Sequence, residues 1–360
     1  MAKRQEQEAA RSEVTEVGPG VLRMELPIHM PGLGHVNCYA LLDDDGAALV
    51  DPGLPGPFSW RALKDRLRRA GLRVRNIHTV VVTHSHADHF GGATRLAREA
   101  GAEIVAHRSF RFGVSEAAHP EVSAEDLAAS REDAPSGGAL HGRQLRDPRD
   151  VWDRPAPWGG APPRPTWKTR LKWAAFSAFR GSIVPPISRP VEAGQVIRLA
   201  KREWFAVHTP GHTEDHICLH DPAEGVFLSG DHVLPTITPH ISGLALAADP
   251  LHAFFESLEQ VAVLPHVGDV LPAHGHPFRD LAARARAIRE HHIERLARVE
   301  AIGRALGPAT VSAFSRELFR KKVWGSMAES ETYAHLEHLR HTQKASRREG
   351  SAGELIYETG

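Results

Sequence analysis

The sequence predicts an α/β fold, and three observations lead to this class. Residues 20–107 alternate between short apolar runs and helical patterns, the order expected when helices pack on a sheet. Several apolar runs end in histidine or aspartate beside a glycine or proline, as strands do where α/β sheets collect their ligands. No run approaches about 18 uninterrupted apolar residues, which argues against a membrane span.

The first third of the chain carries the alternation most clearly. The hydrophobic periodicity predicts strands at 20–28, at 35–53 on both sides of a turn at Asp43–Gly46, at 78–84 and at 102–107, and helices at 60–71 and 91–101. The first helix is indicated by Leu63 and Leu67 on one face, and both helices stop at a glycine. These segments predict the first half of a layered domain.

Residues 110–190 break this rhythm because they are rich in proline, glycine, tryptophan and arginine. A structureless loop of this length is uncommon inside a compact domain. We therefore expect an inserted lid, and a disordered insertion is the alternative that its proline and glycine content permits.

Regular patterns return after the insertion. Residues 195–221, 225–235 and 268–277 are strand-rich, 249–265 predicts a helix, and the chain becomes helical from residue 281. The expected domains are a flexible leader at 1–14, a catalytic domain at 15–280, a C-terminal helical domain at 281–347 and a tail at 348–360.

Composition excludes some partners and favours one compartment. Lysine plus arginine and aspartate plus glutamate both number 44, so the formal net charge of zero gives no electrostatic case for nucleic acid as the main partner. The leader has no apolar core and is not a secretory signal. The two cysteines, Cys38 and Cys218, are expected as buried thiols, with one disulfide as the alternative. These features favour a cytoplasmic protein.

Four strand ends carry potential metal ligands. Residues 84–89 place three histidines and an aspartate in six positions after a run of valines. Histidine and aspartate recur in "HTPGHT", "SGDHV" and "PAHGHP", as His212, Asp231 and His274. Imidazole and carboxylate ligands suit zinc, and iron or manganese would accept the same set.

Seven such ligands with one shared carboxylate are what two metals about 3.5–4 Å apart require. Ordinary surface or capping roles explain many of the other histidines among the 24 in the chain. The sequence thus predicts two divalent ions, with zinc as the first choice.

The motifs "THSHADHFGG", "HTPGHT", "GDHV" and "AHG", with "LVDPG" upstream, resemble those of the metallo-β-lactamase-fold hydrolases. The resemblance covers residues 20–280 apart from the lid. It implies an α/β four-layer αββα sandwich with a dinuclear site between two sheets. It also implies that His84, His86 and His212 hold the first metal, that Asp88, His89 and His274 hold the second, that Asp231 bridges them, and that Asp51 orients a ligand histidine.

Two such ions would generate a bridging hydroxide near neutral pH, so the predicted reaction is hydrolysis of a thioester, ester or lactone, with Asp88 and Asp231 as the catalytic residues. A metal-dependent endoribonuclease or phosphodiesterase is the alternative. A thiol-oxidising dioxygenase with one iron and a non-enzymatic binding protein fit the complete ligand set less well. Lactam hydrolysis is disfavoured because related lactamases are exported and often differ at Asp231.

Two further segments bear on the substrate and on partners. Residues 330–350 resemble the C-terminal winged-helix element of a branch with endoribonuclease-like proteins and polyketide thioesterases, and an ordinary C-terminal helix is the alternative. We expect this element to pack beside the cleft or to form a homodimer. Residues 167–179 combine aromatic and basic side chains, which suits an acyl group on an anionic carrier, whereas nucleic acid is not favoured. The expected substrate contacts are His35, Trp167, Trp173 and Phe176.

Overall fold

The computed structural model describes residues 4–30, 32–112, 156–159, 167 and 183–360. The chain divides into two units. Unit 1 comprises Met1–Phe112, Arg180–Pro239 and Glu256–Ile288, and unit 2 comprises Gly113–Phe179, His240–Phe255 and Arg289–Gly360. Most of the insertion expected at 110–190 lies outside the described residues.

The first sheet of unit 1 has seven strands. Its order is β1 (Val14–Gly18), β2 (Val21–Met30), β3 (Leu33–Leu42), β4 (Ala47–Val50), β5 (Ile77–Val81), β6 (Glu103–His107) and β7 (Arg189–Val191). The strands from β1 to β4 pair antiparallel, and those from β4 to β7 pair parallel. The parallel strands bring their carboxyl ends to one edge of the sheet, where ligands collect in α/β folds.

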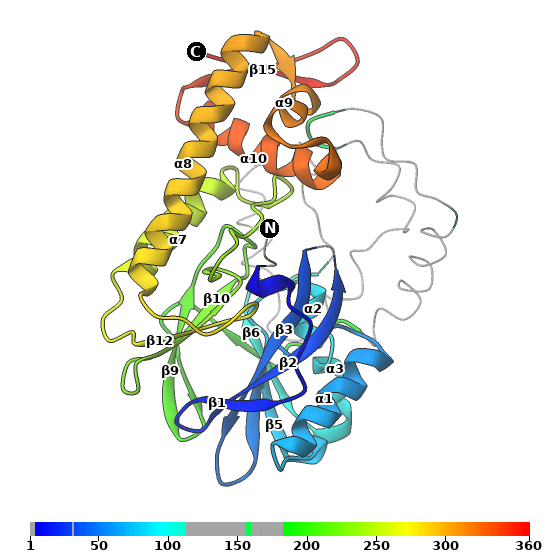
Figure 1. Ribbon diagram of the computed structural model, residues 1–360, viewed down its shortest axis with the longest axis vertical. Helices are drawn as coiled ribbons and strands as arrows, with labels where there is room; N and C mark the ends of the chain where they lie inside the picture. The colour runs from blue at the N-terminus through cyan, green and yellow to red at the C-terminus, as the bar shows by residue number, and fades with distance from the viewer. Residues whose placement is uncertain (1–3, 31, 113–155, 160–166, 168–182) are drawn as a thin grey trace, which may run out of the picture. The chain divides into compact units, whose positions relative to one another are not determined.

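Three helices belong to one face of this sheet. They are α1 (Pro57–Arg69), α2 (Ala87–Phe90) and α3 (Ala93–Ala100), and the short 3₁₀ helix η2 (Val74–Asn76) leads into β5. Leu63 and Leu67 of α1 and Leu96 of α3 are buried in one apolar cluster with Leu26 and Val80 of the sheet. Figure 1 shows α1 and α3 along the outer side of these strands. The predicted helical stripe of α1 is therefore its buried face.

The second sheet of unit 1 has five strands. Its order is β12 (Asp269–Pro272), β11 (Val226–Gly230), β10 (Ile217–Asp221), β9 (Arg202–His208) and β8 (Val196–Leu199). A separate cluster joins Leu41 and Val81 of the first sheet to Trp204 and Leu228 of the second. Because this cluster draws on both sheets, the two sheets pack face to face.

The opposite face of the second sheet is also covered. Side chains alternate along a strand, so Phe227 points away from the inter-sheet cluster that contains Val226 and Leu228, and Phe227 is fully buried. Helices α7 (Pro250–Ala262) and α8 (Leu281–Leu306) each contribute a part to unit 1. These layers give the four-layer αββα sandwich that the resemblance implies.

Unit 2 contains the end of α8 and the elements that follow it. These are β13 (Ala309–Thr310), α9 (Val311–Leu318), η5 (Lys321–Val323), α10 (Ser326–His341), β14 (Ala345–Glu349) and β15 (Leu355–Thr359). The three strands form one sheet in the order β13–β15–β14, and α9 packs on α10. Residues 348–360, expected as a tail, thus include a paired strand whose Tyr357 is buried.

The beginning of the described chain also has defined contacts. Residues 1–14, expected as a flexible leader, include the 3₁₀ helix η1 (Gln5–Gln7), in which Glu6 is fully buried. Cys38 and Cys218 are buried thiols, as expected. Within the described ranges, no helix has the length and apolar character needed to cross a membrane.

Candidate metal centre

The potential ligands follow the carboxyl ends of four strands. His84, His86, Asp88 and His89 come after β5 and extend into α2, His212 follows β9, Asp231 follows β11, and His274 follows β12. The buried strands fix the positions at which these loops begin. Residues that are far apart in the sequence, such as His84 and His274, therefore meet in one place.

The first group consists of His84, His86, His212 and Asp231, whose ligand atoms all lie within 4.8 Å of one another. The Nδ1 atom of His86 is 3.0 Å from His84 Nε2 and 3.1 Å from His212 Nε2. His86 is exposed, whereas the other three members are buried. This group therefore opens to solvent on the side of His86.

The second group consists of Asp88, His89 and His274, and all three side chains are buried. Asp88 Oδ2 lies 3.6 Å from His89 Nε2 and 3.5 Å from His274 Nε2. Asp88 and His89 come from the short helix α2 and His274 from the loop after β12, so both sheets contribute to this group.

Asp231 connects the two groups. Its Oδ2 atom lies 3.6 Å from His212 Nε2 in the first group and 3.5 Å from His89 Nε2 in the second. Its Oδ1 atom lies 3.4 Å from His274 Nε2. One carboxylate therefore reaches both groups.

The arrangement of these side chains suits metal coordination better than hydrogen bonding between the side chains. Within the described chain, Asp231 Oδ1, His89 Nε2 and His274 Nε2 are buried without a hydrogen-bond partner. Ligands about 2.0–2.1 Å from a tetrahedral ion would be about 3.3–3.4 Å apart. Distances of 3.4 and 3.5 Å from Asp231 to the two histidines match that spacing. Both the ligand chemistry and the spacing thus suit a divalent cation in each group.

Asp51 forms a hydrogen bond with one of these histidines, His89. Its Oδ2 atom accepts hydrogen bonds from His89 Nδ1 at 2.8 Å and from the Thr83 hydroxyl at 2.7 Å, and its Oδ1 atom accepts from the Thr83 amide at 2.9 Å. Because Nδ1–H is donated to Asp51, Nε2 is the ring nitrogen of His89 that faces the second group.

Burial and neighbouring charges have opposite effects on the pKa values of His89 and Asp231. Burial disfavours the charged form of His89, but the nearby carboxylates of Asp88, Asp231 and Asp51 outweigh burial and raise its pKa well above the usual value. Burial likewise opposes ionisation of Asp231, but His274 and His89 hold its pKa well below its usual range. The carboxylates thus stabilise positive charge at this site.

Two residues outside the predicted ligand set also support the site. His216 Nε2 accepts the backbone N–H of Asp231 at 3.0 Å, and its Nδ1 atom lies 2.7 Å from the Thr209 hydroxyl. Asp215 accepts a hydrogen bond from the Ser85 hydroxyl at 3.0 Å, and burial raises its pKa to about 7. An aspartate–histidine pair directly before a buried strand is the sequence signal that could have indicated them.

The expected substrate contacts have different outcomes. His35 is instead fully buried, and its ring nitrogens bond the Glu8 carbonyl and the Gly275 amide, so it supports the loop of His274. Trp167 is 70% exposed. Trp173 and Phe176 lie outside the described residues.

A family comparison agrees with this geometry. The model of the metallo-beta-lactamase superfamily matches residues 31–306, which include every ligand named above. The match extends over most of the chain and confirms the resemblance seen in the motifs.

Individual proteins are similar over different lengths. The chain is 28% identical over 225 residues to the acyl-coenzyme A thioesterase MBLAC2 of Gallus gallus, which covers 60% of this chain and 64% of that protein. It is 27% identical over 319 residues to the probable metallo-hydrolase YqjP of Bacillus subtilis, with 85% of this chain and 88% of that protein covered. A metallo-beta-lactamase family protein of Thermus thermophilus superposes with a TM-score of 0.70 at 27% identity, covering 95% and 99% of the two chains.

Proposed function

The chain belongs to the metallo-beta-lactamase superfamily, and we propose that it is a dinuclear zinc hydrolase of this family that cleaves acyl thioesters. The observation that carries the dinuclear site is the position of Asp231, whose two carboxylate oxygens lie 3.4–3.8 Å from histidines of both groups. A single ion would not require a carboxylate that reaches two complete ligand groups.

In this proposal, His84, His86 and His212 hold one ion, Asp88, His89 and His274 hold the other, and Asp231 contributes to both. When bound, such a pair of ions lowers the pKa of water toward neutrality and polarises a carbonyl oxygen. The chain's own part is to hold the ligands. Asp51 fixes the protonated nitrogen of His89, and the His35 carbonyl accepts Nδ1–H of His274 at 2.6 Å.

Asp88 is the residue that we assign to proton transfer. Its Oδ2 atom faces the histidines of the second group, and its other carboxylate oxygen is the base that takes a proton from the attacking water. The carbonyl carbon gains the water oxygen and loses the thiolate, and Asp88 returns the proton to that sulfur. The products are a carboxylic acid and a thiol, so atoms and charges balance.

The thioester class is supported by the chicken relative, which is named an acyl-coenzyme A thioesterase and matches 60% of this chain. Carboxylic esters and lactones present the same carbonyl to the site and are the nearest other substrates. A thioester has the better leaving group, because a thiol is more acidic than an alcohol. We therefore expect thioesters to react fastest.

Nothing specific favours the nuclease alternative. The net charge is zero, which gives no electrostatic case for nucleic acid as the main partner. Helix α10 is buried along most of its length from Ala328 to Leu339. It therefore presents few side chains that could enter a nucleic-acid groove.

The test measures thiol release from a panel of acyl thioesters, acid release from matched oxygen esters and cleavage of single-stranded RNA. The wild-type chain should release thiol, and Asp231→Ala should lower kcat/KM by roughly 100-fold or more because both ions lose a ligand. His78→Ala is the matched control, because His78 bonds Asp43 at the other end of β5 and lies outside both groups.

RNA cleavage without thiol release would overturn the substrate class and favour the nuclease. Full activity of Asp231→Ala would overturn the assignment of the site itself.

A further inference from the structure

The N-terminal segment, residues 4–11, contacts the loops that carry Asp231 and His274. Glu6 is fully buried, and its Oε1 atom accepts the backbone N–H groups of Thr236 at 2.8 Å and Ile237 at 3.1 Å. Its Oε2 atom accepts the Thr236 hydroxyl. A buried carboxylate is costly unless hydrogen bonds satisfy it. These bonds therefore fix residues 236 and 237, which follow Asp231 in the same loop.

Arg284 of α8 holds the same loop from another element. Its guanidinium donates to the carbonyls of Leu234 and Ile237, both at 2.6 Å. Gly275 adds a packing contact, because a Cβ atom there would lie 2.7 Å from Pro235 and 3.4 Å from Glu6. The loop after Asp231, the loop after His274 and the N-terminal segment therefore form one packed body.

The segment reaches His274 through His35. A backbone carbonyl can only accept, so His35 Nδ1–H donates to the Glu8 carbonyl at 2.9 Å. His35 Nε2 is then the acceptor for the Gly275 amide at 3.3 Å. The His35 carbonyl accepts Nδ1–H of His274 at 2.6 Å, which leaves His274 Nε2 as the lone pair that faces the second group.

His276, two residues after His274, is held directly by the segment. Its amide donates to Gln5 Oε1 at 3.1 Å, and its Nε2 atom lies 3.0 Å from Glu8 Oε2.

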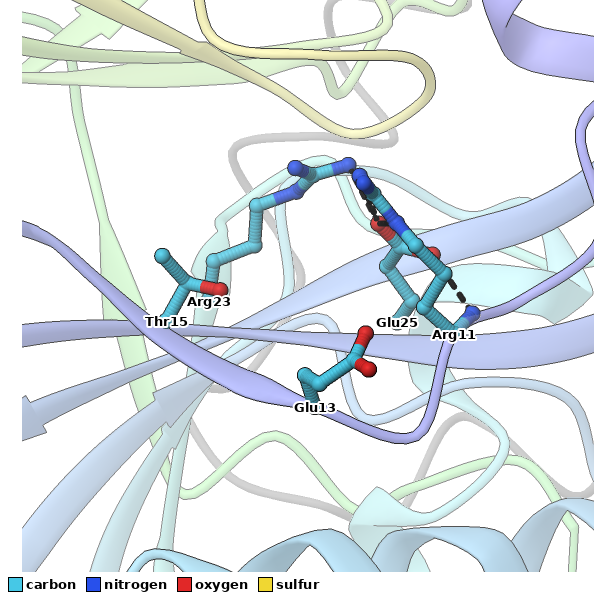
Figure 2. A pocket seen from close by; sticks show the side chains of 5 residues that line it. All are labelled: Arg11, Glu13, Thr15, Arg23 and Glu25. Atoms are coloured by element: carbon cyan, nitrogen blue, oxygen red, sulfur yellow. Dashed lines mark hydrogen bonds and ion pairs between the residues drawn. The ribbon is translucent and has the colours of Figure 1, made fainter.

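A series of ion pairs also connects the N-terminal segment to the loop that carries His274. Arg11 donates to Glu25 through Nε at 3.0 Å, Nη2 at 2.8 Å and its backbone N–H at 2.7 Å. Glu25 also pairs with Arg23 at 2.8 Å, and Arg23 Nη2 donates to the Gly275 carbonyl at 2.8 Å. Figure 2 shows Arg11 and Arg23 converging on Glu25 at the pocket that these three residues line with Glu13 and Thr15.

Gly34 allows the segment to lie this close. A Cβ atom at position 34 would be 2.1 Å from the Glu8 carbonyl oxygen and 2.9 Å from that of Gln7. Backbone atoms cannot move aside as a side chain can, so any larger residue at position 34 would displace the segment from β3.

We propose that residues 4–11 form a latch that positions His274, so that the affinity of the second metal depends on this segment. This inference rests on the proposed dinuclear site. It adds residues that influence metal affinity although they lie far from the ligands in the sequence. None of the segment's hydrogen bonds described above reaches His84, His86 or His212. The segment does hold Thr236 and Ile237, which follow Asp231 in the same loop. The first metal should therefore lose some affinity without the latch, and the second, which also depends on His274, should lose more.

The experiment is a zinc titration of the metal-free chain, with metal per chain measured by elemental analysis after dialysis. The wild type should bind two ions. Glu6→Ala and Gly34→Ala should weaken one site by about 10–100-fold, the effect typical of losing a group that supports a ligand, and weaken the other less. Glu6→Gln should restore part of the affinity, because its amide oxygen still accepts both backbone N–H groups.

Gln7→Ala is the matched control, because Gln7 is an exposed residue of the same 3₁₀ helix. It should bind two ions with wild-type affinity. A general folding defect would weaken both sites equally, so a loss that is clearly larger at one site is specific to the latch.

Two ions at wild-type affinity in both Glu6→Ala and Gly34→Ala would overturn the latch and leave the hydrolase proposal standing. Equal weakening of both sites would also overturn it. Fewer than two ions in the wild type would overturn the dinuclear site, and the latch with it.

Discussion

Asp51 has a backbone conformation that few residues with a side chain adopt, with φ at 55°. This left-handed region costs about 1–2 kcal/mol for most residues and is more tolerable for aspartate. The turn that Asp51 forms before Gly53 brings its carboxylate to His89 and Thr83. The "DPG" motif thus supplies both a turn and a side chain that holds His89, and the sequence alone could not tell these two roles apart.

Asp51→Asn should weaken the second metal by about 10–100-fold. The carboxylate accepts from three donors, two at Thr83 and one at His89. An amide has one oxygen, so its NH2 group must face one of these donors. A zinc titration measures the change in affinity. Asp43→Asn is the control, because Asp43 bonds the half-buried His78 at the far end of β5. Equal affinities in the two variants would contradict the role given to Asp51.

At the scale of elements, the loop between β5 and α3 is held against the loop after β4. Gly91, at the end of α2, donates its N–H to the Gly53 carbonyl at 2.6 Å. A Cβ atom at position 91 would lie 2.0 Å from Pro55 N and 2.1 Å from Leu54 C. Both glycines of "HFGG" can be identified from the sequence, but the backbone segments that they contact cannot be predicted from it.

Gly91→Ala should destabilise the fold by about 1–3 kcal/mol, the usual cost of overpacking, and should reduce metal bound by Asp88 and His89. The backbone of Gly91 is in the right-handed helical region, so the added methyl acts through contact alone. Chemical denaturation and elemental analysis give the two readouts. Gly268→Ala is the control, because its nearest neighbour would be 3.4 Å away. Unchanged stability and metal content in Gly91→Ala would show that the two loops are not coupled.

In unit 2, α8 and α10 are joined by a buried histidine pair. His335 Nδ1 donates to the Glu331 carbonyl at 2.7 Å, so its Nε2 accepts Nδ1–H of His292 at 3.1 Å. Burial is the largest cause that lowers the pKa of His292, to about 2, and that of His335, to about 4. Arg295 lowers both further, whereas Glu331 opposes the shift in both. The folded pair is therefore neutral where an unfolded chain would be protonated.

The folded chain should lose stability as the pH falls from about 6.5 to 4. Unfolded histidine has a pKa of about 6.5, so below this pH the unfolded state binds more protons than the folded pair. Each histidine of the pair then lowers the free energy of unfolding by up to about 1.4 kcal/mol per pH unit. Urea unfolding at several pH values measures the slope.

His292→Leu should make that slope shallower, and His341→Leu, at an exposed position of α10, should leave it unchanged. A wild-type slope that His292→Leu does not alter would contradict the neutral pair.

At the scale of the whole molecule, the sequence could predict that the candidate ligands converge, but not which residues hold them in place. His84, His212, Asp231 and His274 each follow a recognisable strand within a short motif, so their convergence could be predicted. Glu6 and Thr236 are 230 residues apart, and no periodic pattern links them. The N-terminal contacts depend on tertiary packing, which explains why this segment was expected to be a flexible leader.

The same distinction applies to the C-terminal end. Helix α8 was predicted because Ile288, Leu296, Val299 and Leu306 recur at helical spacing. Strand β15 was expected within a tail because its pairing with β14 has little local signal. The lid contacts predicted at Trp173 and Phe176 lie outside the described residues and remain predictions.

Metal content is the most direct test of the central claim, that one loop and three strand ends hold two ions. The measurement is elemental analysis of the chain purified without a histidine tag, beside Asp231→Ala. We predict about two zinc ions per wild-type chain and fewer in the variant, because Asp231 lies 3.4–3.8 Å from histidines of both groups. A single iron, no tightly bound metal, or an unchanged metal content in Asp231→Ala would contradict the claim.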